Sequence, residues 1–196
     1  MHLETLTAAS GAPVVVRAHG LLPDAEQRAL ADDCFALEPK FVDASISGQR
    51  EDWRSGSIVY DPPASGLVVG ERVRAIAAEV ATRLGVASLA TIASLECQLA
   101  LYGDGGFYKL HTDSRGPDVE RRVLSYVHYV SRRPRPFEGG ALRVVAPGGG
   151  ALEIEPEDGT TVFFPSELEH EVLPVRVPSG AFPDGRFAIT GWIWRP

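Results

Sequence analysis

The first 93 residues alternate between strand-like and helix-like patterns of apolar positions. Residues 12–18 (APVVVRA) form a short apolar run that predicts a strand. Residues 21–37 (LLPDAEQRALADDCFAL) repeat their apolar positions at helical spacing and predict a helix. Asp24 and Gln27, three positions apart, have the spacing of a reciprocal N-terminal cap, so we expect them to begin this helix.

A second helix is predicted from about residue 70 to residue 84. Its apolar residues recur three or four positions apart, and Gly85 stands where a helix end favours a left-handed residue. Between the two helices, residues 57–60 predict a short strand that two prolines end. The apolar positions of the second helix are Val69, Val73, Ile76, Val80 and Leu84.

From about residue 94 the pattern changes to short β-rich runs separated by turn sequences. Runs such as LECQLALY, RRVLSYVHYVS and RFAITGWIWR alternate with turns such as GDGG, PGGG and PSGAFPDG. Roughly eight strands at this spacing, without helices between them, indicate an antiparallel sandwich or jelly roll. We therefore expect one domain over residues 1–196, mostly β with supporting α. Residues 1–93 would form a strand and helix layer whose helices pack on one outer face of the β core in residues 94–196.

Composition and charge exclude several classes of protein. The 196 residues are 44% hydrophobic and 23% charged, values that exclude a disordered or fibrous chain. The 19 Lys and Arg against 26 Asp and Glu give a net charge of −7, which argues against nucleic acid or an anionic membrane as a partner. No apolar run approaches the roughly 20 residues of a membrane span. No basic segment leads into an apolar stretch at the start, and two cysteines make no disulfide framework, so we expect a cytoplasmic protein.

Three residues form a candidate metal site. His111 and Asp113 belong to an H-T-D sequence directly after a predicted strand, and on an extended backbone residues i and i+2 point to the same face. His170 follows a distant predicted strand and completes the set if the two sheets fold face to face. Two imidazoles and one carboxylate are the ligands of non-haem Fe(II) oxygenases. Zinc with one water is an alternative, and an H-x-D sequence by itself is more often a surface pair.

Arg186 is a candidate for binding an anion. It begins the apolar final strand, where Arg186, Ala188 and Thr190 alternate to one face. An arginine inside a β core is costly unless it meets an anion, and its planar fork suits a carboxylate. An exposed arginine, or one paired with an internal acid, is the alternative.

Three tyrosines on or beside the predicted strands are candidates for binding a ligand. They are Tyr102, Tyr108 and Tyr129. A buried phenol normally finds a hydrogen-bond partner, and a small dicarboxylate would be one. Core packing is the alternative for each of them.

The motifs taken in order are YGDGGFYKLHTD, RRVLSYVHYVS, FEGGALRVV, GTTVFFPSELEHEV and GRFAITGWIW. They resemble those of the Fe(II)/2-oxoglutarate-dependent dioxygenase superfamily, in its prolyl 4-hydroxylase-like branch. The resemblance covers about residue 94 to the C-terminus and implies a double-stranded β-helix, which is a jelly roll. The N-terminal half matches only in outline.

The resemblance also implies the cofactors. The three candidate metal ligands would bind Fe(II), and Arg186 would bind the distal carboxylate of the cosubstrate 2-oxoglutarate. O2 is the other cosubstrate, and ascorbate is a candidate reductant. Because Asp113 fills the position that halogenating relatives leave empty for chloride, hydroxylation is favoured. Further contacts to 2-oxoglutarate are implied for Tyr102, Tyr129 and Thr190.

The resemblance makes a peptide the expected substrate. We expect hydroxylation of an unactivated C–H bond, of a prolyl residue in a protein or peptide. The alternatives are a free amino acid or small biosynthetic intermediate as substrate, and a non-catalytic metal-binding scaffold. Candidate substrate contacts, for which core packing or solvated charge is the alternative, are Trp53, Arg54, Tyr108 and Arg122.

Overall fold

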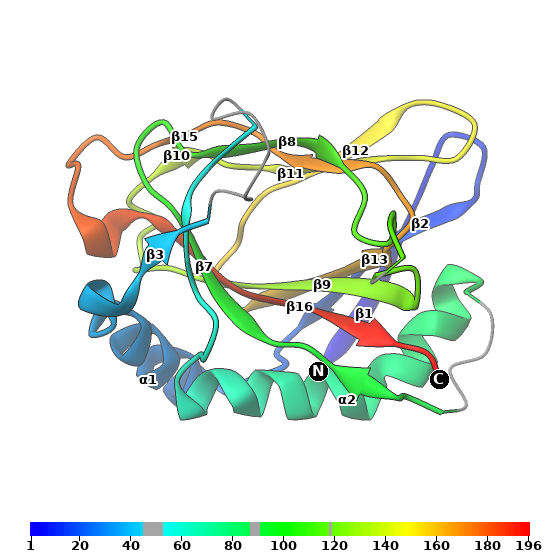
Figure 1. Ribbon diagram of the computed structural model, residues 1–196, viewed down its shortest axis with the longest axis horizontal. Coiled ribbons are helices and arrows are strands. Elements are labelled where there is room, and N and C mark those ends of the chain that lie inside the picture. The colour runs from blue at the N-terminus through cyan, green and yellow to red at the C-terminus, as the bar shows by residue number, and fades with distance from the viewer. Residues whose placement is uncertain (45–52, 87–90, 118) are drawn as a thin grey trace.

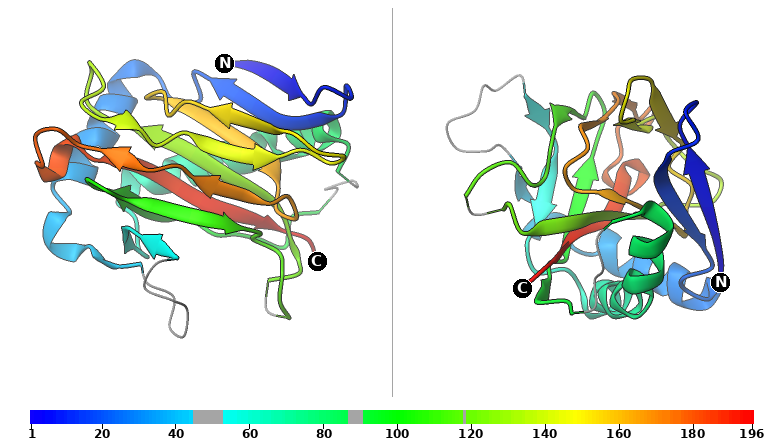
Figure 2. Two further views of the ribbon diagram at one scale, coloured as in Figure 1. Left: turned by 90° about the horizontal axis from the view of Figure 1, so that it is seen from above. Right: turned by 90° about the vertical axis from the view of Figure 1, so that its right-hand side faces the viewer.

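Two antiparallel sheets face each other, and two helices cover the outer face of the larger sheet (Figure 1). This computed structural model describes residues 1–44, 53–86, 91–117 and 119–196. Figure 2 shows the same layering from two further sides, with both helices grouped on one side of the sheets. The fold is therefore mostly β with a supporting helical layer, as the sequence predicts.

The larger sheet carries strands from both halves of the chain. Its central strands come from the C-terminal half, and strands of residues 1–93 extend it on both sides. A short strand, β6 (Ser94–Leu95), pairs with β16 beside this path. In spatial order the sheet is β1 (His2–Thr7), β2 (Pro13–His19), β13 (Thr160–Pro165), β9 (Arg122–Val130), β16 (Arg186–Trp194), β7 (Gln98–Tyr102), β5 (Ser57–Val59) and β3 (Val42–Asp43).

The smaller sheet lies opposite. Its order is β12 (Ala151–Ile154), β11 (Leu142–Val145), β14 (His170–Val172), β8 (Phe107–His111) and β4 (Arg54–Ser55). A separate pair is formed by β10 (Glu138–Gly139) and β15 (Val175–Arg176). From β7 to β16 the chain crosses repeatedly between the two sheets, with β7, β9, β13 and β16 in the larger sheet and β8, β11, β12 and β14 in the smaller one. This winding is the expected double-stranded β-helix.

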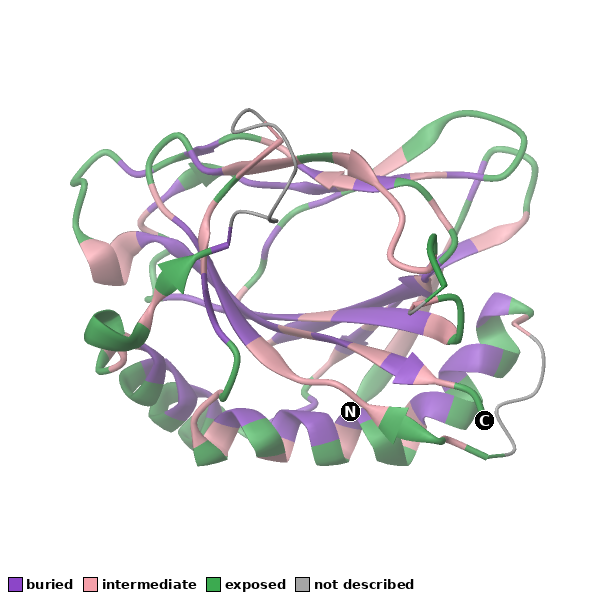
Figure 3. Cartoon of the chain, in the orientation of Figure 1, coloured by how far each residue is buried: buried purple, intermediate pink, exposed green. Residues whose placement is uncertain are grey.

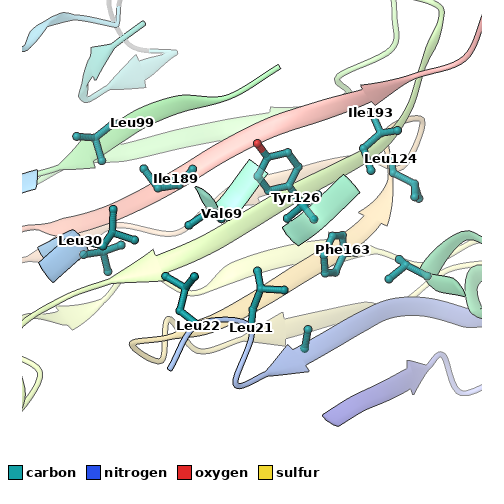
Figure 4. Close-up of a cluster of buried hydrophobic side chains, with 14 of the residues drawn as sticks. Leu21, Leu22, Leu30, Val69, Leu99, Leu124, Tyr126, Phe163, Ile189 and Ile193 are labelled. Atoms are coloured by element: carbon teal, nitrogen blue, oxygen red, sulfur yellow. The ribbon is translucent and has the colours of Figure 1, made fainter. Parts of the chain in front are cut away.

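The helices α1 (Asp24–Phe35) and α2 (Ala64–Leu84) share one apolar core with the larger sheet. Leu30 of α1 and Val69 of α2 pack with Phe163 and Ile189 of the sheet (Figure 4). The helix faces turned to the sheet are buried and the opposite faces are exposed (Figure 3). Two short 3₁₀ helices, η1 (Glu38–Lys40) and η2 (Phe182–Asp184), lie in the connections.

The second helix is longer than its apolar pattern predicts. It begins at Ala64 rather than near residue 70, directly after two prolines. Proline fixes a backbone angle that suits a helix start, so the prolines that end the preceding strand also begin this helix. Gly85 closes it in the left-handed conformation with φ 66°, as predicted. Among the described helices, none has the length and apolar composition needed to cross a membrane.

The predicted cap of α1 is wrong. Its N-cap residue is Pro23, and no side chain caps this helix end. The Gln27 side chain is buried and points to the sheet, where its Nε2 donates to the carbonyl of Tyr129 (3.1 Å) and to Asp158 (2.7 Å). A buried amide is stabilised more by several partners inside the protein than by one exposed backbone N–H.

His128 completes this buried network. Because the Gln27 amide nitrogen donates to two acceptors, its Oε1 is left to accept from His128 Nε2 at 2.8 Å. The Nδ1 of the same ring lies 2.9 Å from the Thr161 hydroxyl, which can donate to it. Both ring nitrogens are thus satisfied in the neutral form, and burial lowers the pKa of His128 to about 4.

The burial of His128 makes stability depend on pH. The unfolded chain takes up this proton below about pH 6.5 and the folded chain only below about pH 4, so stability falls as the pH falls between these values. Between about pH 7 and pH 5, we expect the wild type to lose about 2 kcal/mol more of its free energy of unfolding than His128→Gln does. Urea unfolding of both proteins at the two pH values measures it.

His2 supplies the control for this prediction, because it is an exposed histidine of the same chain. His2→Gln should keep the pH dependence of the wild type. If His128→Gln and the wild type lose the same free energy between the two pH values, another group carries the effect.

Candidate active site

A cleft of about 810 Å³ opens between the two sheets. The site residues that the sequence predicts all line this cleft except Tyr129, which lies behind it under the guanidinium of Arg186. The residues that line it are His111, Asp113, His170, Arg186, Tyr102, Thr190, Trp53, Arg54, Tyr108 and Arg122.

The three candidate metal ligands converge at this cleft. His111 ends β8 and His170 begins β14, and these two residues are paired across the neighbouring strands. Asp113 follows in the crossing from β8 to β9. One ligand atom from each residue lies within 4.8 Å of the others, and the Asp113 carboxylate is 3.6 Å from His111 Nε2 and 3.3 Å from His170 Nε2. We call these residues the His–Asp–His triad.

Backbone carbonyls fix the tautomers of both histidines. His111 Nδ1 lies 2.8 Å from the carbonyl oxygen of Lys109, and His170 Nδ1 lies 2.9 Å from that of Leu168. A carbonyl oxygen only accepts, so each Nδ1 must carry a proton and donate. In the neutral rings each Nε2 then presents its lone pair toward Asp113, which is the arrangement that metal-ligating histidines use.

A β-bulge in β8 brings Tyr108 to the same face as His111. Val172 pairs with Tyr108 and His170 pairs with His111, so β8 has one residue more than β14 between these pairs. Residues three apart face opposite sides of a regular strand, whereas here the two rings stack with centroids 3.6 Å apart. The sequence carries no sign of this bulge.

The electrostatics of the triad favour an ionised carboxylate between two histidines. Burial opposes ionisation of Asp113, but the imidazole of His170, with contributions from His111 and Ser125, outweighs it and lowers the pKa of Asp113. Burial likewise opposes the charge on His170, and the Asp113 carboxylate overcomes it and raises the pKa of His170. Burial and the neighbouring His170 lower the pKa of His111 to about 4. A divalent cation would compensate the buried carboxylate and use both lone pairs.

Two serines that the sequence analysis did not single out hold Asp113. The hydroxyl of Ser125 donates to Asp113 Oδ2 at 2.6 Å, and the Asp113 backbone N–H donates to the carbonyl of Ser166 at 3.0 Å. Ser125 shares its face of β9 with Tyr129, four residues on, and this alternation is the signal that could have identified it.

Arg186 is a buried cation that no acid among the described residues neutralises at short range. Only 1% of its surface is exposed. Within the described part of the chain, its Nε donates to the carbonyl of Gly140 at 2.7 Å, and its Nη2 has no hydrogen-bond partner. The rings of Tyr102 and Tyr129 lie 5.4 and 5.0 Å from the guanidinium carbon. Aromatic faces offset part of the cost of burial, and the unpartnered Nη2 calls for an anionic acceptor.

Arg176 is the other arginine between His170 and the last strand. It is exposed on β15 and pairs with Glu138 at 3.0 Å, so its charge is neither buried nor aimed at the cleft. The burial of Arg186 therefore distinguishes it from Arg176.

Two further residues around Arg186 offer hydrogen bonds. The hydroxyl of Tyr129 is buried without a partner among the described residues, and burial raises the pKa of this phenol against the effect of the nearby Arg186. Thr190 accepts a hydrogen bond from Gln98 Nε2 at 3.3 Å across the β7–β16 pair and keeps its own proton free to donate. Both residues thus present hydrogen-bonding groups of the kind that a carboxylate needs.

Trp53 and Arg54 lie at the edge of the smaller sheet. Arg54, on the edge strand β4, places its guanidinium 4.7 Å from the ring centre of Tyr108. The Nε of Arg54 is buried without a hydrogen-bond partner in the described part of the chain. Arg54 thus contacts Tyr108, and Tyr108 contacts His111 of the triad, so the three lie in a row along the cleft.

Arg122 lines the same cleft, but its charge is already paired. Its Nη2 donates to Glu96 at 2.7 Å, and the guanidinium carbon lies 3.7 Å from the ring centre of Trp192. The guanidinium of Arg122 therefore forms part of the cleft wall beside the triad. Its charge is less available to a ligand than the charge of Arg54 is.

Comparison with protein families gives one match that covers half of the chain. Residues 97–194 match the family model described as the 2OG-Fe(II) oxygenase superfamily. A curated relative, an uncharacterized PKHD-type hydroxylase from Synechocystis sp., is 26% identical over 88% of this chain. The match covers only 60% of that relative, so this chain spans well under its full length.

Solved structures with the same fold include several prolyl hydroxylases. A prolyl-4-hydroxylase from Pseudomonas putida is 29% identical, with 92% of each chain covered and a TM-score of 0.70. A prolyl hydroxylase from Trichoplax adhaerens, solved with a peptide of the hypoxia inducible factor, is 18% identical with a TM-score of 0.69, covering 92% of this chain and 83% of that one. The collagen prolyl hydroxylase of Paramecium Bursaria Chlorella virus-1 is 20% identical with a TM-score of 0.58, and the shares covered are 92% and 95%.

Proposed function

The chain belongs to the 2OG-Fe(II) oxygenase superfamily, and we propose that it hydroxylates an unactivated C–H bond of a prolyl residue in a protein or peptide. Its cofactors are Fe(II) and the cosubstrates 2-oxoglutarate and O2, with ascorbate as a reductant in this proposal. In the proposal, residues 1–93 and 94–196 act as one catalytic unit, because they share a sheet and a core.

The triad would hold the metal. The donor set of two imidazole nitrogens and one carboxylate suits Fe(II), and it leaves coordination positions for cosubstrates. The Nδ1–H bonds to backbone carbonyls keep both Nε2 lone pairs available. When bound, the iron and 2-oxoglutarate supply the oxidation, in which 2-oxoglutarate and O2 yield succinate and CO2 and one oxygen atom enters a substrate C–H bond.

Arg186 would hold the distal carboxylate of 2-oxoglutarate. The unpartnered Nη2 of Arg186 and the unpartnered hydroxyl of Tyr129 are two donors buried side by side, and a carboxylate accepts from both. Tyr102 and Thr190 would complete the contacts to this cosubstrate. These groups orient the cosubstrate and exclude water from its inner end.

One observation carries this proposal: an unneutralised buried guanidinium lies in the same cleft as the His–Asp–His triad. A non-catalytic zinc-binding scaffold would explain the triad but not the buried guanidinium of Arg186. A dicarboxylic cosubstrate that binds metal at one end and arginine at the other uses both.

The peptide substrate rests on the likeness to prolyl hydroxylases and on the mouth of the cleft. Tyr60, which lines the cleft, is 68% exposed, and the half-buried Trp53 lines the same cleft. An exposed aromatic side chain at a cleft suits a substrate that extends beyond it. A free amino acid or small biosynthetic intermediate is the alternative, because a cleft of this volume also accommodates one.

Turnover of 2-oxoglutarate tests the reaction class. With Fe(II), ascorbate and O2, the wild type should form succinate, and Asp113→Ala should abolish succinate formation because it removes the only carboxylate of the triad. His2→Ala, which changes an exposed histidine, should keep the wild-type rate. Succinate formation at the wild-type rate in Asp113→Ala would contradict the ligand assignment.

Mass spectrometry of the products separates the two substrate classes. A library of proline-containing peptides and a pool of free amino acids and metabolites are incubated with the enzyme, and the gain of one oxygen atom is measured in each. The proposal requires the gain on a prolyl residue of a peptide. A gain confined to the small molecules would establish the alternative.

Arg186→Ala should weaken 2-oxoglutarate binding about ten- to a hundredfold or more, because hydrogen bonds to charged groups are worth about 1.5–3 kcal/mol each. The apparent affinity for 2-oxoglutarate in the succinate assay measures the loss. Arg176→Ala removes the exposed arginine of β15 and should leave that affinity unchanged. The reverse result would transfer the carboxylate site to Arg176.

Gly140→Ala should weaken 2-oxoglutarate binding through Arg186. Gly140 has φ +71°, and a Cβ atom there would lie 2.7 Å from Arg186 Cδ, so the arginine would have to move. Gly148 has φ +86° with open space around it, so Gly148→Ala introduces backbone strain of the same kind without this contact. Equal 2-oxoglutarate affinities of the two variants would show that Gly140 does not position the arginine.

A further inference from the structure

The carboxylate of Asp113 is held by a chain of two buried hydroxyls. Ser125 on β9 is 2% exposed, and Ser166, which follows β13, is fully buried. The Ser125 hydroxyl lies 2.6 Å from Asp113 Oδ2 and 3.0 Å from the Ser166 hydroxyl. Oδ2 also lies 3.3 Å from His170 Nε2, and Oδ1 lies 3.6 Å from His111 Nε2. Ser125 belongs to a strand of the larger sheet and Ser166 directly follows one, whereas both histidines of the triad belong to the smaller sheet.

The direction of these hydrogen bonds follows from the groups involved. The ionised carboxylate of Asp113 only accepts, so the single proton of the Ser125 hydroxyl is donated to Oδ2. Ser125 then has only lone pairs left for Ser166, whose hydroxyl must donate to it. The order is therefore Ser166 to Ser125 to Asp113, and each donor in such a chain polarises the next.

The backbone of Ser166 also joins the two crossings between the sheets. The backbone N–H of Asp113 donates to the carbonyl of Ser166 at 3.0 Å, and the N–H of Ser166 donates to the carbonyl of Val123 at 3.1 Å. Asp113 lies in the crossing from β8 to β9, and Ser166 begins the crossing from β13 to β14, which leads to His170. The position of Asp113 relative to His170 thus depends on this contact.

We propose that Ser125 and Ser166 are positioning residues for the metal site. In this proposal Ser125 occupies Oδ2 of Asp113 and keeps Oδ1 for the metal, so that the carboxylate binds through one oxygen and the opposite coordination positions stay open. Ser166 acts through Ser125. The proposal rests on the proposed function, because it assumes that the triad binds a divalent metal.

Titration of the metal-free protein with Mn(II) tests this inference without turnover. Free Mn(II) is measured by electron paramagnetic resonance, and the wild type should bind one ion. Ser125→Ala should weaken Mn(II) binding about 10–100-fold, the usual effect of removing a hydrogen bond to a metal ligand. Ser125→Thr keeps a hydroxyl and should restore affinity to near the wild-type value.

Ser131 supplies a matched control. It directly follows β9, is 5% exposed, and its hydroxyl has no partner within the described residues. Ser131→Ala therefore removes a buried hydroxyl close to the same strand without touching the triad, and it should leave Mn(II) affinity unchanged.

The order of the two serines makes a second test. Ser166→Ala should weaken Mn(II) binding less than Ser125→Ala does, because it keeps the backbone hydrogen bond to Asp113. The double variant should bind Mn(II) as Ser125→Ala does, because the Ser166 hydroxyl reaches Asp113 only through Ser125. If Ser125→Ala does not fold, Ser166→Ala decides, since the proposal requires its affinity to lie below that of Ser131→Ala.

The absorption spectrum of bound Co(II) separates positioning from a general loss of stability. Ser125→Ala frees Oδ2, so the visible bands of Co(II) should change in intensity and position, whereas those of Ser131→Ala should match the wild type. Wild-type affinity and spectrum in a folded Ser125→Ala would overturn this inference alone. A wild type that binds no Mn(II) would instead overturn the proposed function.

Discussion

The buried guanidinium of Arg186 is a charge that the described residues of this protein do not balance. Removing such a cation from water costs several kcal/mol unless an anion and hydrogen bonds compensate it. The Gly140 carbonyl and two tyrosine rings compensate part of this cost, and one end of the guanidinium is left without a partner. In the proposed function, the distal carboxylate of 2-oxoglutarate would compensate the rest of this cost, and the surrounding structure must hold the guanidinium rigidly in place.

The helical layer contributes to this rigidity from the far side of the larger sheet. β9 and β16, which carry Tyr129 and Arg186, are central strands of that sheet, and α1 and α2 pack against their outer face. Gln27 of α1 donates directly to the carbonyl of Tyr129. Gln27 of the first helix thus fixes β9 at Tyr129, the residue whose ring lies under the guanidinium. A buried polar network of this kind fixes one arrangement of strand and helix, whereas apolar contacts alone would tolerate small shifts.

The parts of the site that follow from strand periodicity could be predicted, and the parts that depend on irregular backbone could not. The alternation of β16 places Arg186 and Ala188 on the inner face and Phe187 and Ile189 in the helix-facing core, as expected. Tyr108 was singled out for its place near His111, yet only the bulge in β8 brings it to that face. Gln27 has the spacing of a helix cap, but its side chain binds the larger sheet instead. The local spacing could not predict this, because it contains no information on a partner about a hundred residues away.

The triad and Arg186 lie within the family match, whereas part of the cleft is lined by residues that precede it. The match to the family model begins at residue 97 and includes the triad and Arg186, which any substrate of this chemistry requires. The mouth of the cleft is lined in addition by Trp53, Arg54 and Tyr60, which precede that match. Arg54 and Arg122 both line the cleft, and in the described part of the chain the Nε of each is buried without a hydrogen-bond partner. The charge of Arg122 is neutralised by Glu96, whereas Arg54 stacks on Tyr108. In the proposed function, contacts to the substrate would therefore come in part from the segment around β4 and β5, which lies outside the family match.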